Sequence, residues 1–164
     1  MTGDRVQIEH MTSSDWPSVA RIYKEGIETG MATFEKIVPQ WDIWNKNHLS
    51  ICRFVAKDEN EIIGWAALSP VSSRCVYGGV AEVSVYVSKE GRGQGIGEML
   101  LKRLLSESEN EGFWTLQSGI FPENIASIKI HENVGFRKIG FRERIGELDG
   151  VWKDNILMEK RSKK

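Results

Sequence analysis

A glycine-rich run in the middle of the chain contains the residues whose types and spacing are most typical of ligand binding. Glycines stand at positions 91, 93, 95 and 97, with Arg92 between the first two. Glycine loses more conformational freedom on folding than any other residue, so four of them in seven residues indicate that bare backbone is needed there. A phosphate group held against main-chain N–H groups at a helix start has this need. A tight turn without a ligand is the alternative, although an ordinary turn uses fewer glycines.

The spacing of the glycines distinguishes between the known phosphate-binding motifs. A dinucleotide fingerprint, G-x-G-x-x-G, fails because its third glycine would fall on Ile96 or Glu98. A P-loop fails because no Gly-Lys pair occurs in this region. The pattern that fits is Arg92-x-x-Gly95-x-Gly97. It resembles the pyrophosphate-binding signature of the Gcn5-related N-acetyltransferases (GNAT), a family that uses acyl-coenzyme A.

Two further segments extend this resemblance. Residues 121–136 look like the family's next block, in which an Asn (here Asn124) opens a helix and a Gly-Phe pair follows its end. Residues 152–158 look like the final core strand, so the resemblance covers roughly residues 5–159. Within the family the chain is similar to the phosphinothricin and methionine sulfoximine N-acetyltransferases, enzymes linked to antibiotic and herbicide resistance. The small motifs similar to that branch are Thr33-Phe34-Glu35, Ser84 to Val87, His131-Glu132, and Trp152 with Asp154.

The resemblance implies acetyl-CoA as the co-substrate. In the family the loop amides and the dipole of the following helix hold the pyrophosphate of CoA. By resemblance, Asn124 reaches the pantetheine arm and Asn133 touches the cofactor; a plain helix cap is a second, compatible role for Asn124. Main-chain groups of the strand before the loop would pair with the pantetheine amides as an added strand does. The predicted cofactor residues are therefore Val85, Tyr86, Val87, Arg92, Gly93, Gln94, Gly95, Ile96, Gly97, Glu98, Asn124 and Asn133.

Glu82 is the predicted general base. The implied reaction is direct attack of a primary amine on the acetyl thioester, and an α-amino group with a pKa of about 8 must first lose its proton. From Ala81 to Val87 apolar residues alternate with Glu82, Ser84 and Tyr86, so these three side chains share one face of a strand. Strand interiors seldom carry Glu, and partial burial would raise the pKa of its carboxyl group. An ordinary surface glutamate is the alternative.

His131 is the second candidate for proton transfer. It stands where many family members place a Tyr that protonates the leaving thiolate, and this departure agrees with the phosphinothricin branch. His131 would protonate the thiolate or relay the amine proton. Because Ile125, Ile128, His131 and Val134 follow one another at three-residue steps on one helix face, a packed histidine fits the sequence equally well.

Arg74 is the candidate for binding a substrate carboxylate, because a guanidinium can bind a carboxylate through two parallel hydrogen bonds. It lies in residues 71–77, just before the strand of Glu82, where the branch places substrate contacts. The predicted substrate residues are Phe34, Arg74, Cys75, Val76 and Tyr77. Each of them fits a loop, core or rim position equally well.

The elements that would position these residues follow the order β α α β β β α β α β β. Strands are expected at residues 6–10, 53–57, 61–68, 81–87, 115–120, 137–144 and 152–158. Ser14 is expected to cap the first helix and Gly30 to end it, while Gly112 and Gly135 end the last two helices. Hairpins mixed with crossover helices predict a mixed sheet of the α/β or α+β class, which is the GNAT order. The resemblance also implies that the fourth and fifth strands splay apart to admit pantetheine.

Composition narrows the range of partners. One domain spanning residues 1–164 is expected, and its net charge of −1 argues against nucleic-acid binding. No apolar run approaches the length of a membrane span, and no signal-peptide core is present, so no membrane association is expected. Cys52 and Cys75 do not make a disulfide framework, which suits a cytoplasmic protein, and the scattered histidines predict no metal site. The resemblance implies a homodimer.

Three functions are compatible with these patterns. The first is an N-acetyltransferase acting on a small-molecule amine, an amino acid analogue such as phosphinothricin or methionine sulfoximine. The second keeps the enzyme class but takes a peptide N-terminus or a polyamine as acceptor; no acidic run supports a polyamine site. The third is a non-catalytic acyl-CoA-binding module, which would keep the glycine loop and dispense with Glu82 and His131.

Overall fold

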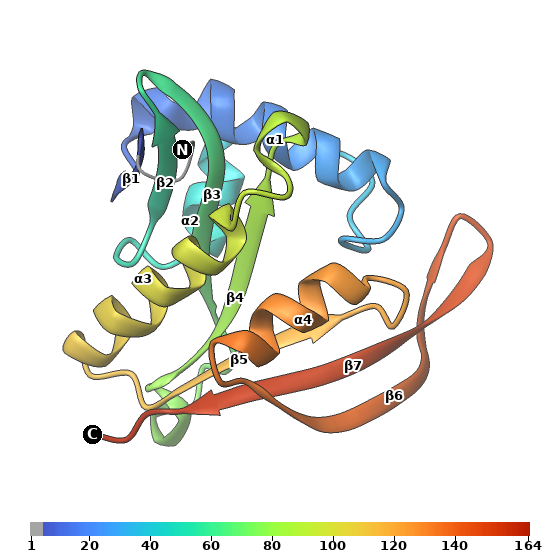
Figure 1. The fold of residues 1–164 in the computed structure, drawn as a ribbon. Coiled ribbons are helices and arrows are strands. Elements are labelled where there is room, and N and C mark those ends of the chain that lie inside the picture. The colour runs from blue at the N-terminus through green and yellow to red at the C-terminus, as the bar shows by residue number, and fades with distance from the viewer. Residues whose placement is uncertain (1–4) are drawn as a thin grey trace.

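The computed structural model, which describes residues 5–164, contains one seven-stranded mixed sheet with helices on both faces (Figure 1). The strand order across the sheet is β1-β2-β3-β4-β5-β7-β6. The strands are β1 (Val6–His10), β2 (Phe54–Asp58), β3 (Glu61–Pro70), β4 (Val80–Val87), β5 (Thr115–Ile120), β6 (Arg137–Leu148) and β7 (Val151–Arg161). The α-helices are α1 (Trp16–Glu28), α2 (Trp41–Asn47), α3 (Ile96–Asn110) and α4 (Ile125–Asn133). The predicted order of elements and the mixed α/β class are confirmed.

The sheet opens into a fork between β4 and β5. These two strands run parallel but are paired only at their beginnings, from Val80–Thr115 to Glu82–Gln117. Every other neighbouring pair is antiparallel, and β5 pairs with β7 over its whole length. Beyond Glu82, one edge of β4 therefore has no neighbouring strand. The splayed strands implied by the family resemblance are confirmed.

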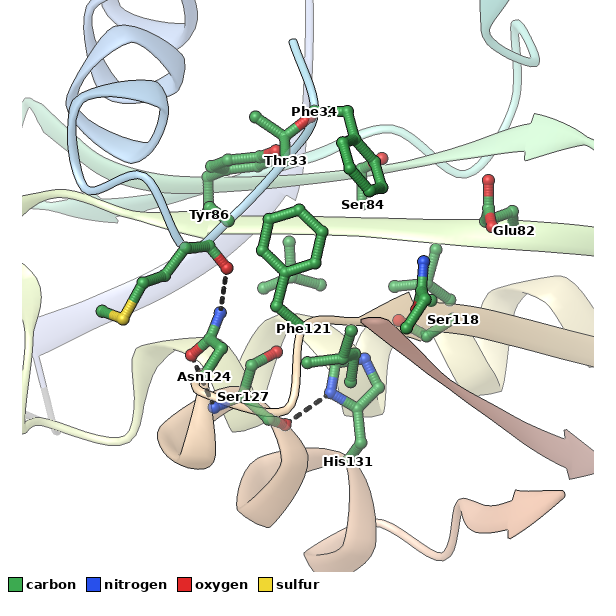
Figure 2. Close-up of a pocket in the computed structure, with 17 residues that line it drawn as sticks. Thr33, Phe34, Glu82, Ser84, Tyr86, Ser118, Phe121, Asn124, Ser127 and His131 are labelled. Atoms are coloured by element: carbon green, nitrogen blue, oxygen red, sulfur yellow. Dashed lines mark hydrogen bonds between the residues drawn. The ribbon is translucent and has the colours of Figure 1, made fainter. Parts of the chain in front are cut away.

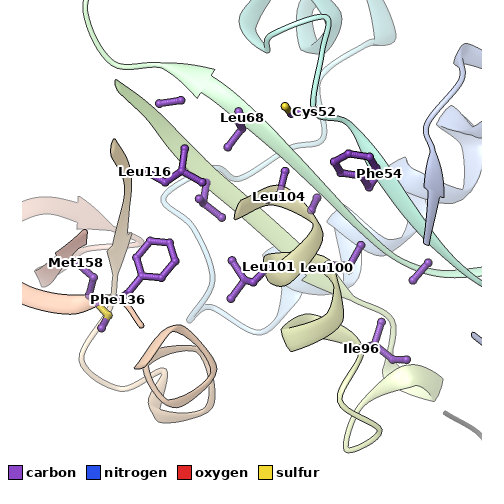
Figure 3. Packing of buried hydrophobic residues seen from close by; sticks show 14 of the residues in the cluster. Cys52, Phe54, Leu68, Ile96, Leu100, Leu101, Leu104, Leu116, Phe136 and Met158 are labelled. Atoms are coloured by element: carbon purple, nitrogen blue, oxygen red, sulfur yellow. The ribbon is translucent and has the colours of Figure 1, made fainter. Parts of the chain in front are cut away.

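Two apolar clusters hold the layers together. The larger lies beneath α3 and α4, where Leu100, Leu101 and Leu104 pack on the sheet, and it reaches Met158 of β7 (Figure 3). The smaller lies on the other face beneath α1 and α2 and is rich in aromatic rings; Trp44 and Trp65 meet there edge to face, with ring centroids 5.6 Å apart. This second cluster draws on β2, β3 and β4 but includes no residue of β5, β6 or β7. Helices thus cover both faces of one half of the sheet and a single face of the other half.

The helix ends follow the predicted chemistry, with one exception. Asn124 caps α4 by accepting a hydrogen bond from the Ser127 N–H at 3.2 Å. Gly30, Gly112 and Gly135 follow α1, α3 and α4 with positive φ angles, as C-terminal glycines do. The predicted cap at Ser14 is wrong: a 3₁₀ turn (Ser13–Asp15) precedes α1, and its capping box joins Thr12 to Asp15 instead. Asp15 serves as the N-cap of α1.

The last two strands form a hairpin longer than predicted. β6 continues to Leu148 and β7 begins at Val151, so that only Asp149 and Gly150 connect them. Both residues have positive φ angles, 50° and 82°, as a tight hairpin turn of this type requires. Register shifts at Lys138/Gly140 and Arg142/Gly146 bend β6 within the hairpin. Across residues 5–164, no helix is long and apolar enough to cross a membrane.

Candidate active site

A cavity of about 260 Å³ occupies the fork between β4 and β5. Its walls are β4, β5, the first turns of α4 and the segment 31–34 that follows α1, with a contribution from β7. Figure 2 shows Glu82 on β4 and His131 on α4 facing this space from different sides, with Ser118 of β5 between them. Phe34 and Phe121 close one side, their rings meeting edge to face at 4.7 Å.

Glu82 projects from β4 into the cavity at the point where β4 and β5 separate. Its side chain reaches solvent through the mouth of the cavity, but the surrounding protein displaces enough water to raise the pKa of the carboxyl group. The side chain of Gln117 and the positive charge of Arg142 counteract part of this effect. Glu82 is therefore a stronger proton acceptor than an ordinary surface carboxylate.

His131 is held in one tautomer by the helix to which it belongs. Its Nδ1 lies 2.7 Å from the carbonyl oxygen of Ser127, and because a carbonyl only accepts, Nδ1 must carry the hydrogen. The other ring nitrogen, Nε2, is buried without a hydrogen-bond partner, and the residue lines the cavity. Burial lowers the pKa of His131, so its imidazole is neutral at pH 7. A neutral ring with a bare Nε2 is a proton acceptor.

The glycine run forms the turn between β4 and α3, and its four glycines serve two different purposes. Gly93 and Gly95 have φ angles of 77° and 76°, and a Cβ on either would meet no atom within 4 Å. These two glycines are needed for backbone conformation, and the space above them is open. Gly91 and Gly97 stand in more crowded places: a Cβ at Gly91 would lie 3.1 Å from the carbonyl oxygen of Ile63, and one at Gly97 would lie 2.8 Å from Ile130 Cδ1.

The loop therefore presents bare backbone at a helix start. Gly95 is the N-cap of α3, and the first N–H groups of an α-helix have no partner within the helix. The positive end of the helix dipole lies at the same place. The arrangement fits a phosphate or pyrophosphate group, as the spacing predicts.

Asn124 joins two walls of the cavity. Besides capping α4, it donates a hydrogen bond from Nδ2 to the carbonyl oxygen of Met31 at 3.4 Å (Figure 2). This bond ties the start of α4 to the segment after α1 that carries Phe34. The predicted cap role of Asn124 is confirmed, and its position on the cavity wall leaves the cofactor role open to test.

The structure brings only part of the predicted site together. Six predicted residues line the cavity: Phe34, Glu82, Val85, Tyr86, Asn124 and His131. Residues 92–98 lie farther along the chain, at the start of α3, and Val87 ends β4. Asn133, the last residue of α4, borders a separate depression next to Lys129 and Lys138. Arg74 caps a 3₁₀ turn (Cys75–Tyr77) that lies outside the cavity, with its guanidinium over the Tyr77 ring at 5.5 Å.

Several cavity residues were missed by the sequence reasoning. They include Ser118, Phe121, Ser127 and Asn155. Asn155 is the most informative of these, because its Oδ1 is buried without a hydrogen-bond partner. A polar residue in the middle of β7, between two other strands, is the signal that could have identified it, since buried polar groups normally have partners.

Tyr86 illustrates how the site is anchored to the aromatic cluster. Its ring stacks on Trp65 at 4.9 Å and lies 5.0 Å from the ring of Tyr23. Burial raises the pKa of Tyr86 well above its ordinary range, so the phenol stays protonated. Across residues 5–164, no three His, Cys, Asp or Glu side chains gather in a group that could hold a metal ion.

Comparison with known proteins identifies the class to which this fold and cavity belong. The model of the acetyltransferase (GNAT) family matches residues 10–136. The chain belongs to the GNAT family of acetyltransferases.

Two relatives indicate the neighbourhood within the family. A phosphinothricin N-acetyltransferase of Streptomyces viridochromogenes is 31% identical over 153 residues, covering 91% of this chain and 84% of the relative. An L-methionine sulfoximine/L-methionine sulfone acetyltransferase of Pseudomonas aeruginosa is 26% identical over 162 residues, covering 89% of this chain and 88% of the relative. The similarity to the phosphinothricin and methionine sulfoximine branch is thereby confirmed.

Two solved structures share the fold. A phosphinothricin acetyltransferase of Sinorhizobium meliloti, solved in complex with acetyl-CoA, superposes with a TM-score of 0.87 at 29% identity, covering 96% of this chain and 88% of that one. A ribosomal-protein-alanine N-acetyltransferase of Brucella melitensis superposes with a TM-score of 0.88 at 30% identity, covering 95% of this chain and 99% of that one. The two similar structures thus carry names for different acceptors.

Proposed function

We propose that this protein transfers the acetyl group of acetyl-CoA to the primary amine of a small amino acid analogue of the phosphinothricin or methionine sulfoximine type. The observation that carries the proposal is the convergence of two proton acceptors, Glu82 and the bare Nε2 of His131, on one cavity at the β4–β5 fork. The amine attacks the thioester directly, with Glu82 as the base.

The chain offers a fitting place for acetyl-CoA. The open backbone at Gly93 and Gly95, together with the N–H groups that begin α3, suits the pyrophosphate. The edge of β4 that has no neighbouring strand beyond Glu82 suits the amides of the pantetheine arm, with Asn124 beside it. When bound, acetyl-CoA supplies an activated acetyl thioester. A contact between Asn133 and the cofactor stays a prediction.

Glu82 would remove the proton that makes the incoming amine unreactive. An amine with a pKa of about 8 or more is mostly protonated at neutral pH, and general bases of this kind typically contribute about 10²- to 10⁴-fold. Burial raises the pKa of Glu82, which brings its proton affinity closer to that of the amine.

His131 would act as a relay and not as a resident acid. Because its Nδ1–H is donated to Ser127, only Nε2 can exchange a proton with the cavity, and at neutral pH Nε2 is empty. His131 could give a proton to a leaving thiolate only after it had taken one from the amine. The sequence left two roles open, protonation of the thiolate and relay of the amine proton. This order of events favours the relay.

A panel of acceptors tests the proposal. The protein is incubated with acetyl-CoA and L-methionine sulfoximine, phosphinothricin, an N-terminal alanine peptide or spermidine, and thiol release is followed. Turnover of the first two compounds with little of the others is the expected result. Turnover of the alanine peptide alone would favour the second candidate, which the similarity to the Brucella melitensis enzyme supports. Tight binding of acetyl-CoA without any acceptor would instead indicate a non-catalytic module.

We also infer a homodimer built around the β6–β7 hairpin. Phe141, Ile145, Val151 and Trp152 all lie on this hairpin and are each more than half exposed. Exposed apolar side chains concentrated on one element of a fold commonly mark an interface. Sedimentation of the wild-type protein should give twice the monomer mass, and Phe141→Glu should shift it to the monomer. A wild-type protein that sediments as a monomer at micromolar concentration would refute the dimer.

A further inference from the structure

The face of the sheet that α1 and α2 leave uncovered carries a row of polar side chains next to Glu82. In β4 the core side chains are Ala81 and Val83, so Glu82 points to the opposite face. On β7, Ile156 and Met158 pack in the same core, which places Asn155 on the Glu82 face. Both Glu82 and Asn155 line the cavity.

Arg142 shares that face. It lies directly opposite Asn155 in the antiparallel pairing of β6 with β7, and directly opposite residues project to the same side of a sheet. The positive charge of Arg142 also lowers the pKa of Glu82, in agreement with a position beside the mouth of the cavity. The carboxylate of Glu82 and the amide of Asn155 thus line the cavity, and Arg142, which is exposed and is not itself a lining residue, lies next to Asn155 on the same face, where its charge acts on Glu82.

Arg142 is exposed and Asn155 is partly buried, and within the described residues no protein group occupies the guanidinium of the first or the Oδ1 of the second. Within the described residues 5–164, Arg142 takes part in no ion pair, whereas Arg137 on the same strand binds Glu159 at 2.8 Å. The Oδ1 of Asn155 is buried and accepts no hydrogen bond. The amide lies close against the backbone of β5, because a Cβ on Gly119 would lie 3.0 Å from its Nδ2. A buried acceptor without a donor is costly unless a ligand supplies one.

An α-amino acid has the complementary chemistry. It presents N–H donors and a carboxylate on the same carbon, so a site for it needs an acceptor and a cation next to each other. A guanidinium binds a carboxylate through two parallel hydrogen bonds, which fixes both position and orientation. Glu82 and Asn155 can only accept at the atoms described, so both suit the amine end.

We propose that Arg142 and Asn155 form the amino acid receptor of this enzyme, with Arg142 binding the α-carboxylate and the Oδ1 of Asn155 accepting an N–H of the amine. The inference rests on the proposed function and names its specificity-determining residues. It assigns the carboxylate to Arg142 in place of Arg74. Neither arginine lines the cavity, but Arg142 lies next to Asn155 and its charge acts on Glu82, whereas the guanidinium of Arg74 lies over the Tyr77 ring.

Two variants and two substrates test the two halves of the receptor separately. The substrates are L-methionine sulfoximine and its α-carboxamide, which keeps the amine and removes the carboxylate charge. The variants are Arg142→Gln and Asn155→Leu, and Arg144→Gln is the matched control for an arginine two positions along β6. Each variant is compared with the wild type on each substrate, so that the different basicity of the two amines cancels.

Arg142→Gln should lower kcat/KM for the amino acid by about 10- to 100-fold, mainly through KM, because a charge-assisted hydrogen-bond pair is lost. Its kcat/KM for the carboxamide should stay within about threefold of the wild-type value, because this substrate has no carboxylate for Arg142 to bind. Asn155→Leu should lower kcat/KM for both substrates by a similar factor, since both carry the amine. Arg144→Gln should behave like the wild type. Acetyl-CoA affinity and the circular dichroism spectrum should be unchanged in all three.

Different outcomes overturn different claims. If the wild type acetylates the amino acid but Arg142→Gln affects both substrates equally or neither, the receptor assignment is wrong and the proposed function stands. If Arg74→Gln shows the carboxylate-selective loss, the carboxylate belongs to Arg74. If the wild type acetylates neither amino acid analogue yet acetylates a peptide or polyamine, the proposed function fails and the receptor fails with it.

Discussion

The two halves of the sheet are built differently, and the difference separates scaffold from site. Strands β1 to β4 carry helices on both faces, and their central aromatic residue, Trp65, is 1% exposed. Strands β5, β7 and β6 carry a helix on one face, and Trp152 of β7 is 56% exposed. β4 forms the boundary, with Val83 in the core and Glu82 in the cavity. We call the half with helices on both faces the closed half, and the half with a helix on one face the open half. Side chains in the closed half pack against one another, whereas polar side chains in the open half remain available for a ligand.

The strongest test of this contrast is to replace an isoleucine by alanine once in the closed half and once in the open half. Ile22 on α1 is fully buried, whereas Ile125, the first residue of α4, is 73% exposed. Ile22→Ala leaves a cavity in the aromatic cluster and should lower the free energy of unfolding by about 2–5 kcal/mol. Ile125→Ala removes little buried surface and should lower it by less than about 0.5 kcal/mol. Urea denaturation measures both, and equal losses would contradict the contrast.

A second pair of variants adds a methyl group at a glycine instead of truncating a larger side chain. A Cβ on Gly26 of α1 would lie 2.5 Å from the Tyr86 ring, which Trp65 and Tyr23 hold in place. Gly26→Ala should therefore cost about 1–3 kcal/mol of unfolding free energy through overpacking. Gly140→Ala on β6 is the control, because a Cβ there would meet no atom within 4 Å. A neutral Gly26→Ala in thermal unfolding would show that the aromatic cluster can rearrange.

Gly119→Ala should affect binding more than stability, because it lies in the open half. The added Cβ would lie 3.0 Å from the Asn155 amide, which lines the cavity, so the amide would have to shift by a few tenths of an ångström. We expect KM for L-methionine sulfoximine to rise by up to about 10-fold, equivalent to about 1.4 kcal/mol of binding. The unfolding midpoint should hardly change. An unchanged KM would indicate that the position of Asn155 does not matter for the acceptor.

The smallest expected effect is a pH dependence of stability shared by the two halves. Burial lowers the pKa of His48, which stacks on Trp44 in the closed half, and of His131 in the cavity. Below a pH of about 6.5 the unfolded chain binds protons that the folded imidazoles do not yet accept, so stability falls as the pH falls. His48→Gln and His131→Gln should each flatten this decline in urea titrations between neutral and mildly acidic pH. A decline of the same slope in both variants would assign it to other groups.

The order of elements could be predicted because each one carries a local signal. Period-two alternation marks β4, and glycines with positive φ end three helices. The start of α1 was misplaced because Thr12, Ser13, Ser14 and Asp15 are all good capping residues, and the reciprocal bonds of Thr12 and Asp15 decide between them only in three dimensions. The turn at Asp149-Gly150 had a strong hairpin signal, but the bulges in β6 interrupt the alternation that leads up to it.

The cofactor loop and individual cavity residues such as Glu82 and His131 could be predicted, but most of the acceptor side could not. The glycine spacing points to a phosphate site because it acts through local backbone geometry. The acceptor side depends on cross-strand neighbours such as Arg142 and Asn155, whose pairing is set by a register that no local pattern shows. Arg74 was preferred because residues 71–77 are where the phosphinothricin branch places substrate contacts, yet it does not line the cavity.

The most direct test of Glu82 as the base is the pH dependence of kcat/KM in the wild type and in Glu82→Gln, with L-methionine sulfoximine as the acceptor. If Glu82 takes the proton from the bound ammonium, the wild-type value should be level between the raised pKa of Glu82 and the pKa of the amine. In Glu82→Gln only free amine can react, so kcat/KM should rise about tenfold for each pH unit up to the amine pKa, with the largest deficit at the lowest pH. Two profiles of the same shape would contradict the assignment.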